Sequence, residues 1–415
     1  MSIRRPINLP GDKSISHRAL MLSALAKGES RITNISTGDD VRSTKECLQS
    51  CGIQINNDDN ITFVNGGTLS DPKTPLNCGN SGTTTRLLLG LLSGQGINAT
   101  LTGDNSLSSR PMKRVLDPLK IMGLSAECSN GTLPIKIQKS PLKGIRYATP
   151  ISSAQVKSAI LLAGLGALGD TTVLEKLVTR DHTEKMLIRL GARLLSHETG
   201  SRISPLSNPL SSFEISVPGD PSTAAFFAAY AGILPGSEII IKGVLINPTR
   251  IGFLRILKKM GGQVSFIRKW KEAGELIGDI KITYNPLISA TIRSNDIPDL
   301  IDELPIIAIL ATQANGCTTV RDAQELRVKE CDRISAICYN LKNMGADIVE
   351  LDDGFIINGP TSLKGTKIKT YHDHRIAMAF TIAGLIADGE TVLDNPDCIG
   401  VSYPEFFKTI EYLNK

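Results

Sequence analysis

The sequence predicts an α/β protein with two domains. Each domain is expected to hold three βαβαββ repeats with buried helices and outer sheets, an inside-out α/β barrel. The main observation is a segment that recurs six times, about every 70 residues, whereas solenoid repeats run about 20–50 residues. A second observation is the length, because 415 residues are too many for one hydrophobic core. Three copies in each of two domains give domains of ordinary size.

Each copy begins with a short polar turn and continues as an apolar helix and a β-branched run. The helices expected at 159–165 and 306–311 are apolar on nearly every side, which is typical of buried helices. We therefore expect helices in the centre of each domain and sheets outside. The starts of the six copies are marked by Ser14, Gly82, Ser153, Pro221, Asp302 and Asp373.

A second, amphipathic helix in each copy is expected to stop at a glycine. Glycine favours the left-handed backbone conformation that closes a helix. A short strand-like run follows each stop, and the sixth copy ends with the chain at 403–413. The five stops are Gly52, Gly123, Gly191, Gly261 and Gly345.

Two similar Pro-Gly-Asp turns, at 10–12 and 218–220, are the expected places where the chain passes between domains. They predict one domain over 11–219. The second domain combines 1–10 with 220–415. We expect the active site in the cleft between the two domains.

The composition is that of an ordinary globular chain, with 41% hydrophobic and 21% charged residues. A net charge of +5 does not indicate a nucleic-acid binder, but it is compatible with small anionic substrates. The eight cysteines contain no CxxC pair, which argues against a zinc or redox site and is typical of reduced thiols in the cytoplasm. Among the histidines only His372 and His374 have the spacing of metal ligands, and a lone pair of this kind is more often structural, so we expect no metal. The sequence shows no secretory signal, and its apolar runs are too short to span a membrane.

Polar and charged side chains gather at the starts of the apolar helices. A helix N-terminus carries unpaired N–H groups and about half a positive charge, so it attracts anions. Serine and aspartate at such places are often simple N-caps, and that interpretation stays open for Ser153 and Asp302. Capping does not explain Lys13, Arg18 and Arg375, because a cation there opposes the helix dipole unless an anion is bound.

The second helices supply further cations, among them Arg110 and Arg180. Lys329, Asp332 and Arg333 have the spacing of one helix face, which would bring their charges together. The plain alternative for these three residues is a solvated, ion-paired helix surface.

Six motifs follow one another along the chain: LPGDKSISHR at 9–18, GNSGT at 79–83, RP at 110–111, SAQ at 153–155, RVKE with DR at 327–333, and DHR at 373–375. Together they resemble the 5-enolpyruvylshikimate-3-phosphate synthase family of enolpyruvyl transferases, from residue 9 to about 407. The resemblance implies transfer of the enolpyruvyl group of phosphoenolpyruvate to the 5-hydroxyl of shikimate 3-phosphate, by addition and elimination. This is a shikimate-pathway step toward chorismate and the aromatic amino acids. The resemblance also implies that the enzyme needs no cofactor and that glyphosate inhibits it. We expect a monomer.

The resemblance also implies a role for each matching residue. Arginine forks suit the carboxylate and phosphate groups of both substrates. Asp302 is the expected base, with Lys329 beside it, and Glu330 is the expected proton donor, with Lys13 as the alternative. Phosphoenolpyruvate is expected at Lys13, Gly82, Thr83, Arg110, Gln155, Arg333 and Arg375. Shikimate 3-phosphate is expected at Lys13, Ser14, Arg18, Ser153, Ala154, Gln155, Arg180, Asp302 and Lys329.

The chain departs from the family pattern in its C-terminal segment. Some members place a phosphoenolpyruvate-binding lysine there, and the stretch 398–403 has none. The run 181–184 is similar to a branch that includes glyphosate-tolerant enzymes, although that branch tends to have alanine where this chain has Gly82.

Two alternative functions compete with this interpretation. The UDP-N-acetylglucosamine enolpyruvyl transferase shares the fold but carries a loop cysteine, and the stretch 102–110 has no cysteine. A non-catalytic protein that binds anions or RNA ends would have no use for Asp302 and Glu330, because buried carboxylates weaken anion binding.

Overall fold

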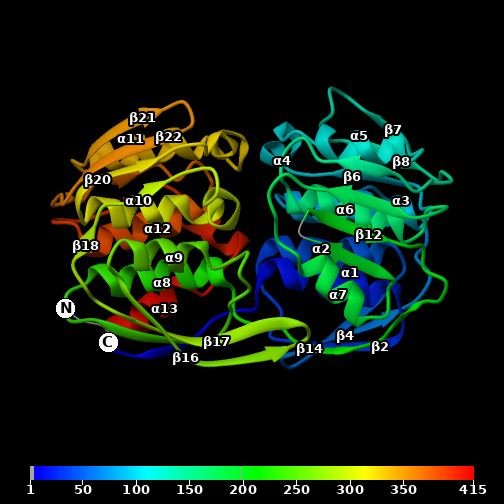
Figure 1. Ribbon diagram of the computed structural model, residues 1–415, viewed down its shortest axis with the longest axis horizontal. Coiled ribbons are helices and arrows are strands. Elements are labelled where there is room, and N and C mark those ends of the chain that lie inside the picture. Colours follow the sequence, from blue (N-terminus) through cyan, green and yellow to red (C-terminus); the bar gives the residue numbers. More distant parts are fainter. Residues whose placement is uncertain (1–3, 198) are drawn as a thin grey trace. The chain divides into compact units, whose positions relative to one another are not determined.

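The computed structural model describes residues 4–197 and 199–415, and the chain divides into two compact units (Figure 1). The mixed α/β architecture with two domains is therefore confirmed. The N-terminal unit comprises Gly11–Val217 together with Ala273–Glu275. The C-terminal unit comprises the segment that ends at Pro10, Pro218–Glu272 and Leu276–Lys415.

Three sheets form the N-terminal unit, one for each repeat. Each sheet combines a parallel pairing with an antiparallel hairpin, as the βαβαββ pattern requires. The first sheet has the order β13 (Leu210–Ser211), β2 (Ala26–Thr33), β4 (Ile61–Gly66), β3 (Gln54–Asp58), and β14 (Glu214–Ser216) also pairs with β2. The second has the order β5 (Leu76–Asn77), β6 (Ala99–Thr102), β8 (Ile135–Gln138), β7 (Ser125–Cys128). The third has the order β9 (Arg146–Ala148), β10 (Thr171–Leu174), β12 (Gly200–Ile203), β11 (Leu194–His197).

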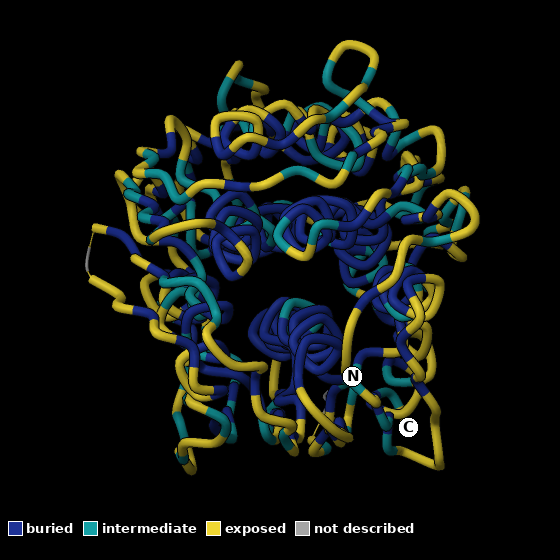
Figure 2. Tube along the Cα trace, turned by 90° about the vertical axis from the view of Figure 1, so that its right-hand side faces the viewer, coloured by how far each residue is buried: buried dark blue, intermediate teal, exposed yellow. Residues whose placement is uncertain are grey.

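The first helix of each of these repeats is buried along nearly its whole length. These helices are α1 (Lys13–Leu25), α3 (Gly82–Gly94) and α6 (Ala154–Gly164). Figure 2 shows buried helices in dark blue with exposed segments around them. The remaining helices are α2 (Asp39–Ser50), α4 (Asn105–Ser109), α5 (Lys113–Ile121) and α7 (His182–Arg189). The expectation of inner helices and outer sheets therefore holds in this unit.

The C-terminal unit repeats the same plan around α8 (Pro221–Ile233), α10 (Leu304–Thr312) and α12 (His374–Ile386), which contact one another (Figure 1). Its first sheet has the order β1 (Pro6–Asn8), β15 (Glu238–Leu245), β17 (Glu275–Thr283), β16 (Gln263–Glu272). Its second has the order β18 (Leu287–Ile288), β20 (Ala314–Val320), β22 (Gly354–Gly359), β21 (Asp347–Leu351), and β19 (Thr291–Ile292) also pairs with β20. Its third pairs β23 (Lys367–Ile368) with β24 (Val392–Leu393). The other helices are α9 (Gly252–Lys259), α11 (Arg333–Asn343), α13 (Phe406–Asn414) and the 3₁₀ turns η1 (Ile297–Asp299), η2 (Ile301–Glu303), η3 (Gln324–Val328) and η4 (Pro396–Val401).

Each unit completes its first sheet with a strand from another part of the chain. The N-terminal strand β1 pairs in parallel with β15 of the C-terminal unit. Strands β13 and β14, which follow the third repeat, pair in parallel with β2 of the first repeat. Within residues 4–197 and 199–415 the sheet of the sixth repeat is smaller than those of the other repeats, with two strands.

The glycines after the second helices have the expected conformation. All five have a positive φ, between +85° and +109°, where a side chain would be strained. The prediction of five helix stops is therefore confirmed at Gly52, Gly123, Gly191, Gly261 and Gly345.

Candidate functional site

The buried helices of the N-terminal unit begin at capping side chains. Asp12, Ser81 and Ser153 each accept a hydrogen bond from a backbone N–H in the first turn of α1, α3 and α6. Ser153 therefore caps α6, and its assignment as a ligand stays a prediction. The N-terminus of a helix also carries a partial positive charge, which favours anions there.

A polar cluster at the starts of α3 and α6 gathers four expected ligands of phosphoenolpyruvate. The Gln155 side chain donates from Nε2 to Oγ1 of Thr83 at 3.0 Å. Arg110 donates from Nη2 to Oδ1 of Asn80 at 2.6 Å and from Nη1 to its carbonyl oxygen at 3.2 Å. A Cβ built on Gly82 would lie 3.6 Å from Nη1 of Arg110. Residues from three separate segments thus lie close together.

Arg86 belongs to this cluster, and sequence reasoning missed it. Its Nη1 donates to Oε1 of Gln155 at 2.7 Å, and its side chain is buried. The residue stands one helical turn after Gly82 on α3, so both face the same way. An arginine within an otherwise apolar, buried helix was the signal that could have identified it.

Lys13, Ser14 and Arg18 come from the first turns of α1. Lys13 forms an ion pair with Asp40 at 2.8 Å and keeps a side chain that is partly exposed. Arg18 is only 4% exposed, and its guanidinium donates to Thr183 Oγ1 at 2.6 Å, to Ser158 Oγ at 2.8 Å and to the carbonyl oxygen of Ser14 at 2.9 Å. Arg18 thereby ties α1 to α6 and α7.

The C-terminal unit gathers a second cluster, centred on Asp302 of η2. Its Oδ1 lies 3.6 Å from Nζ of Lys329 and 3.6 Å from Nη1 of Arg333. Arg375, in the first turn of α12, donates to the carbonyl oxygen of Asp302 at 3.0 Å. Glu330 accepts from Nη2 of Arg333 at 2.6 Å. All five expected residues from this half of the chain therefore meet in one place.

The backbone at Lys329 and Arg333 differs from the sequence expectation. We expected these residues and Asp332 to share one helix face. Instead η3 ends at Val328, and α11 begins only at Arg333, with Asp332 as its N-cap. Asp332 accepts a backbone hydrogen bond and also pairs with Arg327 at 2.7 Å. Its side chain is committed to the cap, so the shared-face expectation was wrong.

Burial and neighbouring charges act oppositely on the two main cations of this cluster. Burial lowers the pKa of Lys329 below the usual lysine value, and the attraction of Asp302 offsets only part of this effect. For Arg333, burial is outweighed by Asp373, Glu330 and Asp302, which raise the pKa of its guanidinium. Arg333 is fixed by a 2.7 Å bond from Nε to Asp373. It is a permanent, buried positive charge.

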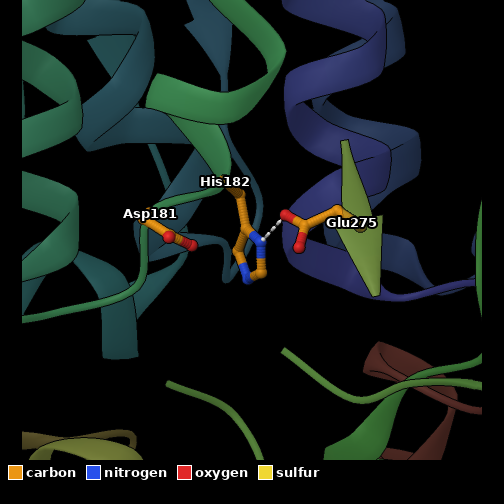
Figure 3. Close-up of side chains that lie close together, drawn as sticks. All are labelled: Asp181, His182 and Glu275. Atoms are coloured by element: carbon orange, nitrogen blue, oxygen red, sulfur yellow. Dashed lines mark hydrogen bonds and ion pairs between the residues drawn. The ribbon is translucent and has the colours of Figure 1, made fainter. Parts of the chain in front are cut away.

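One group of residues could hold a metal ion by geometry: Asp181, His182 and Glu275 (Figure 3). Nδ1 of His182 lies 2.6 Å from Oε1 of Glu275. Nζ of Lys185 lies 3.0 Å from Asp181 and 3.3 Å from Glu275. Because the ammonium of Lys185 pairs with both carboxylates, we interpret the group as an ion-pair network.

The fold and the two clusters define a class of protein. Each unit combines helix N-termini with arginine and lysine side chains, which suits small molecules that carry several negative charges. The C-terminal cluster adds carboxylates beside a lysine, which can move protons. The chain is thus equipped to bind polyanions and to catalyse a proton-dependent reaction on them.

The chain belongs to the family described as EPSP synthase (3-phosphoshikimate 1-carboxyvinyltransferase), whose model matches residues 2–410. The 3-phosphoshikimate 1-carboxyvinyltransferase of Thermodesulfovibrio yellowstonii is 46% identical, over 100% of this chain and 98% of the relative. That of Streptococcus pyogenes is 48% identical over 98% and 96%. A solved EPSP synthase from Acinetobacter baumannii has a TM-score of 0.87 at 38% identity, over 99% and 96%. The enolpyruvyl transferase NikO from Streptomyces tendae shares the fold, with a TM-score of 0.81 at 18% identity, over 100% and 95%.

Proposed function

We propose that this enzyme transfers the enolpyruvyl group of phosphoenolpyruvate to the 5-hydroxyl of shikimate 3-phosphate, giving 5-enolpyruvylshikimate 3-phosphate and phosphate. The family membership over residues 2–410 supports the reaction. The observation that carries the residue assignment is the meeting of Asp302, Lys329 and Glu330 with two arginines, from three segments of the C-terminal unit.

The reaction consists of an addition and an elimination. In the addition, the 5-hydroxyl oxygen bonds to C2 of phosphoenolpyruvate, the hydroxyl proton leaves and C3 gains a proton. In the elimination, the bond from C2 to the phosphate oxygen breaks, phosphate leaves and C3 loses a proton. Both steps need groups that accept and donate protons at fixed positions.

Asp302 and Lys329 suit the hydroxyl side of the reaction. The carboxylate of Asp302 takes the hydroxyl proton, and the ammonium of Lys329, 3.6 Å away, stabilises the charge that develops there. Both side chains are largely buried, with 16% and 29% exposed, so water weakens the interaction little.

Glu330 is the proton donor at C3, and its partner Arg333 must be engaged elsewhere when it acts. In the structure Glu330 is engaged by Arg333 at 2.6 Å. The carboxylate or phosphate of phosphoenolpyruvate would compete for that guanidinium, and Glu330 could then carry a proton. Lys13 is the alternative donor.

The ligands of each substrate are assigned from the family motifs that they match. Phosphoenolpyruvate is held by the cations Lys13, Arg110, Arg333 and Arg375, with Gly82, Thr83 and Gln155 beside it. Shikimate 3-phosphate is held by Lys13, Ser14, Arg18, Ser153, Ala154, Gln155, Arg180, Asp302 and Lys329. The enzyme acts as a cytoplasmic monomer without nucleic-acid partners. Within the described part of the chain, no helix is both long enough and apolar enough to cross a membrane.

Transfer in D₂O tests the addition–elimination sequence. A deuteron that adds to C3 makes a transient methyl group, and elimination then removes either isotope. The vinyl methylene of the product should therefore carry deuterium by NMR. A product free of deuterium would contradict protonation at C3 and leave Glu330 without a role.

A further inference from the structure

In the N-terminal unit, Lys157 forms a buried ion-pair triad with Glu175, which precedes Arg180 in the chain, and with Glu184, which follows it. Nζ of Lys157 on α6 lies 2.7 Å from Oε2 of Glu175 and 2.7 Å from Oε1 of Glu184 on α7. The three side chains are only 2–4% exposed. No step of the proposed reaction uses them. A buried ion pair is a weak source of stability, because desolvation offsets its attraction, so its presence points to another role.

The ammonium of Lys157 is charged at neutral pH. Burial alone would lower its pKa, but Glu184 and Glu175 together raise the pKa above the usual lysine value. One cation therefore holds two carboxylates from different segments, and the three segments cannot separate without leaving a buried charge unpaired.

Thr179 connects this triad to Arg180. Lys157 donates from Nζ to the carbonyl oxygen of Thr179 at 3.4 Å. The hydroxyl of Thr179 donates to Oε1 of Glu175. Thr179 is only 5% exposed, so the triad fixes both the carbonyl and the hydroxyl of the residue that precedes Arg180.

The chain is also fixed on the other side of Arg180. His182, the first residue of α7, contacts Glu275 through Nδ1 at 2.6 Å (Figure 3). The hydroxyl of Thr183 lies 2.7 Å from that of Ser158, the residue after Lys157 on α6. Arg180 stands between these buried anchors and remains partly exposed.

We propose that Lys157 is a positioning residue for Arg180, and that the triad thereby sets the affinity for the phosphate group of the acceptor substrate. The inference rests on the proposed function, which places Arg180 among the ligands of shikimate 3-phosphate, and it assigns the phosphate group to this guanidinium. A guanidinium that donates two parallel hydrogen bonds must be held at a fixed place and angle. If the triad is broken, the segment that carries Arg180 is held less firmly. The guanidinium then loses part of its hydrogen bonding to the phosphate, although Arg180 itself is unchanged.

Steady-state kinetics of four proteins test the proposal: the wild type, Lys157→Met, Arg180→Ala and the double variant. Lys157→Met keeps the length of the side chain and removes its charge. It should raise the KM for shikimate 3-phosphate about tenfold or more, the scale of one charge-assisted hydrogen bond, and change the KM for phosphoenolpyruvate little. Arg180→Ala should raise the same KM. In that background Lys157→Met should add nothing, because both changes remove one interaction.

Two further variants separate positioning from stability. Thr179→Val keeps all three charges and removes only the hydroxyl, so it should fold normally and raise the same KM by a smaller factor. It decides the question if Lys157→Met does not fold. Ile55→Ala opens a cavity in β3, outside the triad, so it should lower the melting temperature and leave both KM values unchanged.

The possible failures can be told apart. If Arg180→Ala raises the KM for shikimate 3-phosphate but Lys157→Met and Thr179→Val only lower the melting temperature, the triad is structural and the inference is wrong. Additive effects in the double variant would also overturn it. If Arg180→Ala leaves that KM unchanged, the assignment of Arg180 to shikimate 3-phosphate in the proposed function fails, and the inference fails with it.

Discussion

A methyl group on Gly82 would lie 2.7 Å from Nη1 of Arg86. The atom it meets is the far end of a flexible side chain, which can shift, and the next atoms it would approach also belong to the Arg86 and Arg110 side chains. Arg86 in turn donates to Gln155 at 2.7 Å. A side chain at position 82 would therefore displace Arg86, and with it the contact to Gln155, at the expected site of phosphoenolpyruvate.

This relationship bears on inhibition by glyphosate. From the family resemblance we expect glyphosate to bind beside Gly82 and to inhibit the wild type. Gly82→Ala should weaken glyphosate binding by about 1–3 kcal/mol, because the methyl group intrudes on the larger inhibitor more than on the substrate. It should raise the KM for phosphoenolpyruvate modestly. The inhibition constant and this KM, measured for both proteins, check the prediction.

Gly90→Ala provides a contrast on the same helix. Its Cβ would lie 2.1 Å from the carbonyl oxygen of Ala159, where α3 and α6 pack backbone to backbone. This variant should lose stability, whereas Gly82→Ala should not. An insensitive wild type, or an unchanged ratio of the two constants in Gly82→Ala, would refute the steric account.

The acid–base assignment predicts a separation of turnover from binding. Glu330→Gln keeps the shape of the side chain but removes the transferable proton, so turnover should fall about 10²-fold or more. Shikimate 3-phosphate should still bind, which calorimetry can measure. Asp302→Asn should also slow turnover. A Glu330→Gln enzyme with wild-type turnover would move the donor role to Lys13, and Lys13→Ala would then abolish the reaction.

The lowered pKa of Lys329 predicts the alkaline limit of activity. Because burial favours the neutral amine, Lys329 loses its charge at a lower pH than an ordinary lysine. As pH rises, kcat/KM should therefore decrease, and this decrease should begin at a pH below the range in which lysine usually titrates. Lys329→Arg keeps a positive charge and should move this limb to higher pH. A limb at the same pH in both proteins would exclude Lys329 as its origin.

His17 predicts how stability depends on pH. Burial, together with the charges of Lys13 and Arg18, lowers the pKa of His17 well below 6.5, and its Nδ1 lies 2.7 Å from Oγ1 of Thr44. The unfolded chain then binds the proton more readily than the folded one. His17 therefore leaves the free energy of unfolding unchanged above about pH 6.5. As pH falls below this value, His17 lowers the free energy of unfolding, with a slope of at most about 1.4 kcal/mol per pH unit.

Urea unfolding between pH 7.5 and 5 measures this effect. His17→Gln should flatten the dependence of the free energy of unfolding on pH. The matched control is His197→Gln, because His197 is exposed on β11 and should leave the slope unchanged. Equal slopes in all three proteins would show that His17 makes no contribution.

The repeat pattern was sufficient to predict the helices and their ends. Gly52 and its four counterparts could be identified because a helix stop has a local conformational demand that glycine meets. The pairing of β1 with β15 could not be predicted, because a strand of three residues carries no signal for a partner strand more than 200 residues away. The place of Glu275 could not be predicted either, because it lies at the end of a hairpin of the C-terminal unit and yet belongs to the N-terminal unit.

The site was predictable where the residue types are unusual for their place in the fold. Arg375 and Lys13 stood out as cations at helix starts. Lys157 and Arg86 are also charged residues in apolar helices, but their roles depend on partners, Glu184 and Gln155, that only the tertiary structure brings near. The expected helix face at 329–333 failed because the capping preference of Asp332 outweighed the helical spacing.

Phosphate release from phosphoenolpyruvate, measured with two acceptors in parallel, tests the central claim most directly. With shikimate 3-phosphate the enzyme should release one phosphate for each molecule of 5-enolpyruvylshikimate 3-phosphate formed. With UDP-N-acetylglucosamine it should release none. No release with shikimate 3-phosphate, or release with the nucleotide sugar instead, would contradict the account.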